Sequence, residues 1–126
     1  MNDFRFLLLS TMLIVSSYCF SQKQAEIVWK EKVHDFKQIS SKDSLVSIIF
    51  PFTVKGEEAV VIYEASASCG CTKAEWTKYP IISGKEGFVR VYLRTVDLRG
   101  YFDKRIIVKS NAKKNLDLLR IKGYIK

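Results

Sequence analysis

Hydrophobic residues recur at every second position along short stretches of this chain. The clearest stretch holds Val46, Ile48, Phe50 and Phe52. Side chains two positions apart lie on the same face of a β-strand, so this pattern predicts strands with one buried face. No window shows convincing helical periodicity, and the chain is therefore expected to be all-β.

About seven strands are expected, separated by turns that contain Gly, Asn or Asp. They cover residues 33–36, 46–53, 59–66, a short segment around residue 76, and residues 89–93, 102–108 and 119–125. Such strands at intervals of about 8–12 residues are typical of an Ig-like β-sandwich. An eight-stranded barrel is the structural alternative, but the strand count falls short of it.

Residues 1–21 have the layout of a secretory signal peptide. Arg5 contributes a positive charge, residues 6–15 form an apolar run, and residues 16–21 form a short, polar-leaning exit. The run is shorter than the about 20 residues of an ordinary membrane-spanning helix. We therefore expect export to the periplasm or the cell exterior, followed by cleavage of residues 1–21.

Two alternatives to simple cleavage remain at this end of the chain. The apolar run would serve as an uncleaved anchor if the peptide were retained, although it is short for spanning. Cys19 would carry lipid if the protein were a bacterial lipoprotein. Bulky Tyr18 directly before it argues against lipidation, because such sites favour a small residue there.

Residues 22–126 are expected to form a single Ig-like domain that does not span a membrane. The whole chain has 21 basic and 13 acidic residues, and its net charge is +8. Removing residues 1–21 takes away one Arg and one Asp, so the mature charge is unchanged. The basic residues are scattered rather than interleaved with aromatic ones, which disfavours nucleic acid and leaves an anionic cell-surface component as a candidate partner.

The segment Ser68-Cys69-Gly70-Cys71-Thr72 is the one feature that strand propensity does not explain. Cysteines two apart in a regular strand are too far apart for a disulfide. A bond between Cys69 and Cys71 therefore needs a folded backbone, which Gly70 would permit. Because the ring closes almost no chain, it would add little stability.

Three interpretations of the cysteine pair stay open: a local structural feature, a thiol redox centre, and a Cu(I) or half-zinc site. His34 is the only imidazole that would serve as a third ligand, but a solitary histidine is more often structural. Trp76, Tyr79 and Tyr92 would form a binding platform, or else close the edge of the core. The residues imply no cofactor and no catalytic acid–base set.

The chain resembles the domain-of-unknown-function 1573 family of exported bacterial proteins. The resemblance runs from Val33 to Ile125 and rests on a series of matching motifs and single residues. They are His34-Asp35-Phe36, Ala67-Ser68-Cys69-Gly70-Cys71-Thr72, Glu75-Trp76, Pro80-Ile81, Gly84, Gly87, Gly100, Phe102, Lys104, Ser110-Asn111-Ala112 and Ile121-Lys122-Gly123.

The resemblance implies an Ig-like sandwich akin to the interaction domains of major sperm protein and cilia-associated families, and it implies no established activity. Two loop positions depart from the family pattern. Lys37 stands where members usually carry Gly, and Val54-Lys55-Gly56 replaces an Asn-x-Gly hairpin. We therefore expect a non-enzymatic module that binds a protein or a cell-surface component, with a thiol redox or Cu(I) role at Cys69 and Cys71 as the alternative.

Export is testable on the secreted protein. Mass spectrometry of its N-terminus should find Gln22 as the first residue, because Ser21 completes the small, polar exit of the signal peptide. A lipid-modified Cys19 recovered from the membrane fraction would contradict this expectation.

Overall fold

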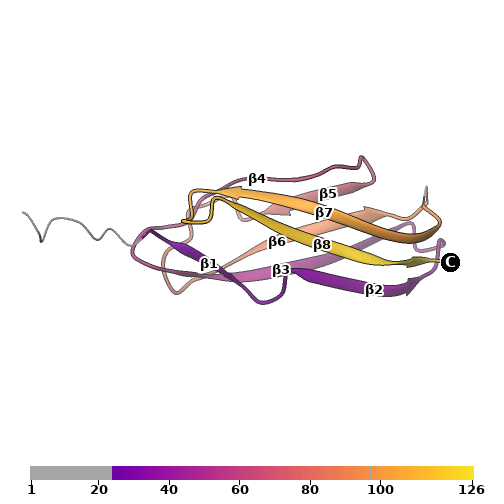
Figure 1. The fold of residues 1–126 in the computed structure, drawn as a ribbon, viewed down its shortest axis with the longest axis horizontal. Coiled ribbons are helices and arrows are strands. Elements are labelled where there is room, and N and C mark those ends of the chain that lie inside the picture. Colours follow the sequence, from indigo (N-terminus) through magenta and orange to yellow (C-terminus); the bar gives the residue numbers. More distant parts are fainter. Residues whose placement is uncertain (1–23, 97) are drawn as a thin grey trace, which may run out of the picture.

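The computed structural model describes residues 24–96 and 98–126, which form two four-stranded sheets stacked face to face. Figure 1 shows the sheets as two layers along the long axis of the molecule. The predicted all-β sandwich is confirmed. Among the described residues, no helix is long and apolar enough to cross a membrane. The expected signal peptide, residues 1–21, lies outside them.

Eight strands build the two sheets. Their bounds are β1 Glu26–Trp29, β2 Val33–Ile39, β3 Leu45–Lys55, β4 Ile62–Ala67, β5 Thr72–Trp76, β6 Glu86–Arg94, β7 Gly100–Ser110 and β8 Leu116–Ile125. One sheet has the order β1-β3-β6-β5, and the other has the order β2-β8-β7-β4. All neighbouring strands are antiparallel except β2 and β8, which are parallel.

The sequence pattern missed β1 and misplaced the start of β4. With four residues, β1 holds only two apolar side chains on one face, Ile27 and Trp29, which is too short a repeat to stand out. The strand expected at residue 59 begins at Ile62 instead, because Val60 forms an isolated bridge with Ile81 rather than joining β4.

The core lies between the sheets and is built from the alternating apolar positions. Fully buried side chains come from β3 and β6 on one side and from β7 and β8 on the other. They include Phe50, Phe52, Val89, Val91, Leu93, Ile106, Val108, Leu119 and Ile121. Burying each large side chain contributes about 1.5–3 kcal/mol, so this interface dominates the stability of the fold.

Gly87 allows two core side chains to approach the backbone of β6. A Cβ atom at this position would lie 2.5 Å from both the Ile81 Cδ1 and the Phe52 Cζ atoms. A side chain there would push the Phe52 ring out of place, so glycine is required for packing rather than for its backbone conformation.

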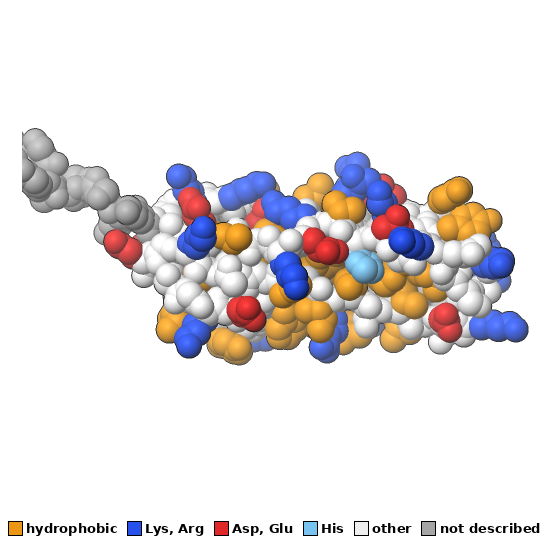
Figure 2. Space-filling view, turned by 90° about the horizontal axis from the view of Figure 1, so that it is seen from below, with side chains coloured by type: hydrophobic (Ala, Val, Ile, Leu, Met, Phe, Trp, Pro, Cys, Tyr) orange, Lys and Arg blue, Asp and Glu red, His pale blue; other side chains and the backbone are white. Residues whose placement is uncertain are grey.

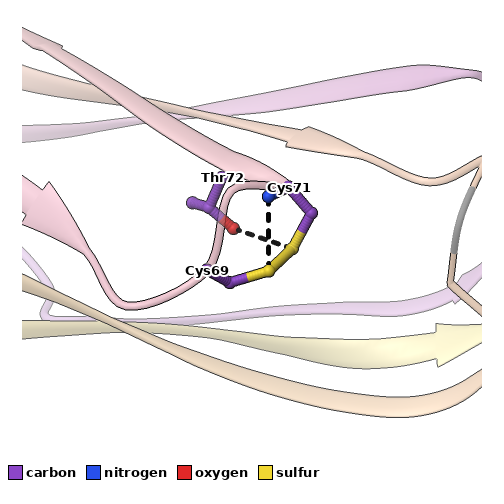
Figure 3. Close-up of a disulfide and its surroundings, with 3 residues drawn as sticks. All are labelled: Cys69, Cys71 and Thr72. Atoms are coloured by element: carbon purple, nitrogen blue, oxygen red, sulfur yellow. Dashed lines mark hydrogen bonds between the residues drawn. A yellow bond between two sulfur atoms is a disulfide. The ribbon is translucent and has the colours of Figure 1, made fainter.

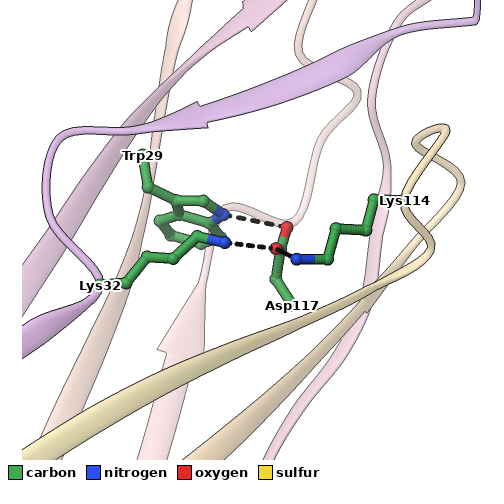
Figure 4. A network of polar contacts seen from close by, with 4 residues as sticks. All are labelled: Trp29, Lys32, Lys114 and Asp117. Carbon is green, nitrogen blue, oxygen red and sulfur yellow. Dashed lines mark hydrogen bonds and ion pairs between the residues drawn. The ribbon is translucent and has the colours of Figure 1, made fainter.

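A buried carboxylate ties the two sheets together at the β1 side. Asp117 of β8 is 6% exposed. It accepts hydrogen bonds from the Trp29 Nε1 and Lys32 Nζ atoms, each at 3.0 Å, and Lys114 Nζ lies 3.5 Å away (Figure 4). Because a buried charge needs such partners, these contacts fix the edge strand β1 against the opposite sheet.

Asn111, which directly follows β7, holds the chain where it enters the neighbouring edge strand β4. Its side-chain amide donates to the Ala59 carbonyl at 3.0 Å, and its carbonyl accepts from the Val61 N–H at 2.8 Å. The side chain thus replaces ladder hydrogen bonds where the chain enters β4.

Lys37 adopts a backbone conformation that favours glycine. The pairing of β2 with β8 shifts register between Asp35 and Gln38, and Lys37 within this bulge has a φ of 58°. Its N–H donates to Asp35 Oδ1 at 2.8 Å. The left-handed region costs an ordinary residue roughly 1–2 kcal/mol, whereas glycine enters it freely. The position at which the family resemblance expects glycine is therefore one where glycine fits better.

Replacing Lys37 with glycine should stabilise the domain by about 0.5–1 kcal/mol, the relief of strain less the extra entropy of glycine in the unfolded chain. The free energy of unfolding in urea measures this gain. Lys37→Ala is the matched control, because it removes the same side chain and keeps the strain. Equal stability of the two variants would contradict the assignment.

Candidate functional site

The cysteine segment lies in the turn that joins β4 to β5. These are edge strands of different sheets, so the chain crosses from one sheet to the other at this corner of the sandwich. The Thr72 N–H donates to the Cys69 carbonyl at 3.2 Å and closes the turn. In Figure 1 the turn lies at the same end of the molecule as the C-terminus.

Cys69 and Cys71 are joined by a disulfide, with their Cα atoms 5.3 Å apart. Both residues are half-buried, and Cys71 packs against the edge of the core. The Cys71 N–H donates to Cys69 Sγ at 3.2 Å, and the Thr72 hydroxyl oxygen lies 3.7 Å from Cys71 Sγ (Figure 3). The two sulfurs therefore have different surroundings.

Gly70 does not use the conformational freedom of glycine. It is not among the glycines with positive φ, and a Cβ atom at this position would meet nothing within 4 Å. The backbone folds at this point with a conformation that other residues can adopt, so the expected need for glycine is not found. What the exposed glycine does provide is an unobstructed surface beside the disulfide.

A groove of about 420 Å³ adjoins Cys71 on the outer face of the β1-β3-β6-β5 sheet. Its walls come from three strands: Leu45 from β3, Lys73 and Glu75 from β5, and Tyr92 and Arg94 from β6. The backbone N–H of Arg94 donates to the Cys71 carbonyl at 2.8 Å, which holds the two strands together here. Nothing in the sequence pattern places Leu45, Lys73 or Arg94 beside the cysteines.

The remaining residues named from the sequence are spread over the fold. Ser68 is exposed in the same turn. Trp76 ends β5 on the inward face, where it packs against the core with Lys78 Nζ 3.2 Å from its ring centroid. Tyr92 lies on the outer face and donates its hydroxyl to Glu75 at 3.1 Å. Trp76 and Tyr92 are thus on opposite faces of one sheet and do not share a platform.

His34 is distant from the cysteine turn in the topology. It lies on β2, the edge strand at the far side of its sheet from β4. Its Nδ1 atom is 3.4 Å from Glu31 Oε1, and its ring contacts Phe36 edge-on with centroids 4.6 Å apart. Within residues 24–96 and 98–126, no three side chains of the ligating types gather as a metal site.

The arrangement combines a half-buried disulfide, one sulfur that accepts a backbone N–H, and a groove lined by two basic side chains and one acidic side chain. A disulfide in such a position is chemically able to undergo thiol–disulfide exchange.

Comparison with models of protein families identifies a family that this chain matches. The model of the family described as protein of unknown function (DUF1573) matches residues 27–125. The chain belongs to the DUF1573 family. Among curated proteins, none matches its sequence significantly.

Solved structures show how widely the fold of this DUF1573 member occurs. A protein of unknown function from Porphyromonas gingivalis W83 is similar with a TM-score of 0.67 and 11% identity, over 84% of this chain and 50% of that one. The ASH/PapD-like domain 7 of human CEP192 is similar with a TM-score of 0.60 and 11% identity, over 82% of this chain and 85% of that domain. The secreted serine protease VesC from Vibrio cholerae is similar with a TM-score of 0.58 and 11% identity, over 79% of this chain and 23% of the protease.

These likenesses show the fold alone. The chain spans half of the Porphyromonas protein and under a quarter of the protease, whereas it spans most of the CEP192 domain. The likeness to a PapD-like domain confirms the predicted Ig-like character of the sandwich.

Proposed function

We propose that this DUF1573 protein is an exported, non-enzymatic interaction domain that binds a partner protein with an acidic surface. The signal-peptide pattern of residues 1–21 supports export. The Ig-like sandwich supports an interaction role, because such folds present sheet faces and loops to partners. The observation that carries the proposal is an apolar patch on the outer face of the β2-β8-β7-β4 sheet.

Three exposed aliphatic side chains form this patch: Ile107 (43% exposed), Leu116 (49%) and Leu118 (43%). Ile107 lies directly opposite Leu118 in the β7–β8 register. Leu116 lies two positions before Leu118 on β8 and therefore on the same face of the sheet. Cross-strand neighbours lie about 5 Å apart, so the three side chains adjoin. Contiguous exposed apolar side chains with a polar rim favour a docking role, and these three side chains would form its centre.

The rim of the patch has a small excess of basic side chains. Outward positions of β7 and β8 hold Arg105, Lys109, Arg120 and Lys122. Their acidic neighbours are Asp103, Glu64 of β4 (3.8 Å from Lys109) and Asp35 of β2, which lies opposite Lys122. Arg120 donates to Asp103 and holds the pKa of that carboxyl below its usual value. An apolar centre with a net basic rim complements an acidic protein surface, and such charges mainly raise association rates and specificity.

The wider charge pattern also suits a protein partner better than nucleic acid. On the side of the molecule seen in Figure 2, Lys and Arg are scattered among acidic and hydrophobic side chains rather than gathered in one stripe. A nucleic-acid surface would need a continuous basic stripe along the backbone path.

The proposal is tested with a photo-crosslinking amino acid at position 118 in cells that export the protein. The crosslinked partner is identified, purified and titrated against the secreted domain. Leu118→Glu should weaken the affinity at least about tenfold, or about 1.4 kcal/mol, because it places a charge in the apolar centre and an acid against an acidic partner. The wild-type affinity should also fall as salt rises.

Val28→Glu is the matched control, since Val28 is similarly exposed (39%) but lies on β1 in the other sheet. It should bind as wild type does. The proposal is wrong if no crosslink from position 118 exceeds that from position 28, or if both glutamate variants bind equally well.

A further inference from the structure

We propose that the Cys69–Cys71 disulfide exchanges with a dithiol of another exported protein and accepts two electrons from it. The incoming thiolate attacks Cys71 Sγ, and Cys69 leaves as the first thiolate. This exchange needs no stable complex, so it stands independently of the interaction patch on the other sheet.

The hydrogen bonds at the turn decide which sulfur leaves. Cys69 Sγ accepts the Cys71 N–H at 3.2 Å. A backbone donor stabilises the negative charge that develops on a departing sulfur, and a stabilised thiolate leaves faster. Cys71 Sγ has only the Thr72 hydroxyl at 3.7 Å, so breaking the bond toward Cys69 is favoured.

The surroundings of Cys71 decide which sulfur is attacked. Cys71 lines the groove on the outer sheet face, together with Lys73 and Arg94, whereas Cys69 does not. Both basic residues are exposed, and Glu75, which accepts the Tyr92 hydroxyl, is the one acidic side chain of the lining. The groove therefore keeps a net positive charge that attracts an incoming thiolate. Leu45 and Tyr92 offer apolar walls to the residues that flank the attacking cysteine. A Cβ atom at Gly70 would meet nothing within 4 Å, so the space beside the disulfide is open there.

The exchange balances as two successive displacements. A partner thiol loses its proton, forms a bond to Cys71 Sγ and breaks the bond between the cysteines, with the electron pair moving to Cys69. The partner's second thiolate then attacks its own sulfur in the mixed disulfide and expels Cys71. The partner gains a disulfide, the pair becomes two thiols, and the two protons released by the partner end on Cys69 and Cys71.

Two backbone hydrogen bonds hold the turn independently of the disulfide. The Thr72 N–H to the Cys69 carbonyl and the Arg94 N–H to the Cys71 carbonyl do not involve sulfur. The reduced cysteines therefore stay close together, ready to be oxidised again.

The test treats the secreted protein, expressed from its full-length chain, with reduced glutathione, and then blocks free thiols with iodoacetamide. Peptide mass spectrometry should find glutathione on Cys71 and the alkyl group on Cys69. Dithiothreitol should reduce the pair fully while the domain stays folded, as judged by its far-ultraviolet circular dichroism.

Charge variants test the role of the groove. The Lys73→Gln/Arg94→Gln variant should react with anionic glutathione at least about threefold more slowly, because two attracting charges are lost. Lys55→Gln, at the opposite end of β3 from Leu45, should react at the wild-type rate. Glutathione found mainly on Cys69, a pair that stays oxidised in the folded protein, or equal rates in the charge variants would overturn the proposal.

Discussion

The packing of two sheets against each other through alternating apolar side chains is the constraint on which this fold depends. Phe50 and Phe52 from one sheet and Ile106 and Leu119 from the other are almost fully buried. Because alternate residues of β3, β6, β7 and β8 are committed to this interface, the residues between them face outward. Surface function is thereby separated from stability, and the outer faces can differ in proteins that share the fold at 11% identity.

Polar contacts add to the core in holding the sides and corners of the sandwich. Asp117 secures β1 at one side, and Asn111 secures the entry to β4 at the other. The cysteine turn closes the remaining corner with two backbone hydrogen bonds. A disulfide is not needed to bring such close residues together, so its chemistry is free to serve another purpose.

The sequence predicts the strands in which apolar and polar residues alternate over a long stretch, such as β3. It also predicts the sandwich as a whole. It does not predict β1, which is four residues long and gains its order from pairing with β3 and from the Trp29–Asp117 contact. The groove is equally hidden, because Lys73 and Arg94 are far apart in sequence and meet only through the register of β5 on β6. Local pattern shows the cysteine pair, whereas only tertiary structure shows what surrounds it.

The sandwich is expected to stand without its disulfide. Equilibrium unfolding of Cys69→Ser/Cys71→Ser in urea measures how much the bond contributes. A bond across so short a loop is worth only about 1.6 kcal/mol by chain entropy, so the double variant should fold cooperatively and lose no more than that. A loss of more than about 3 kcal/mol, within the range of a disulfide that staples a small domain, would contradict the account.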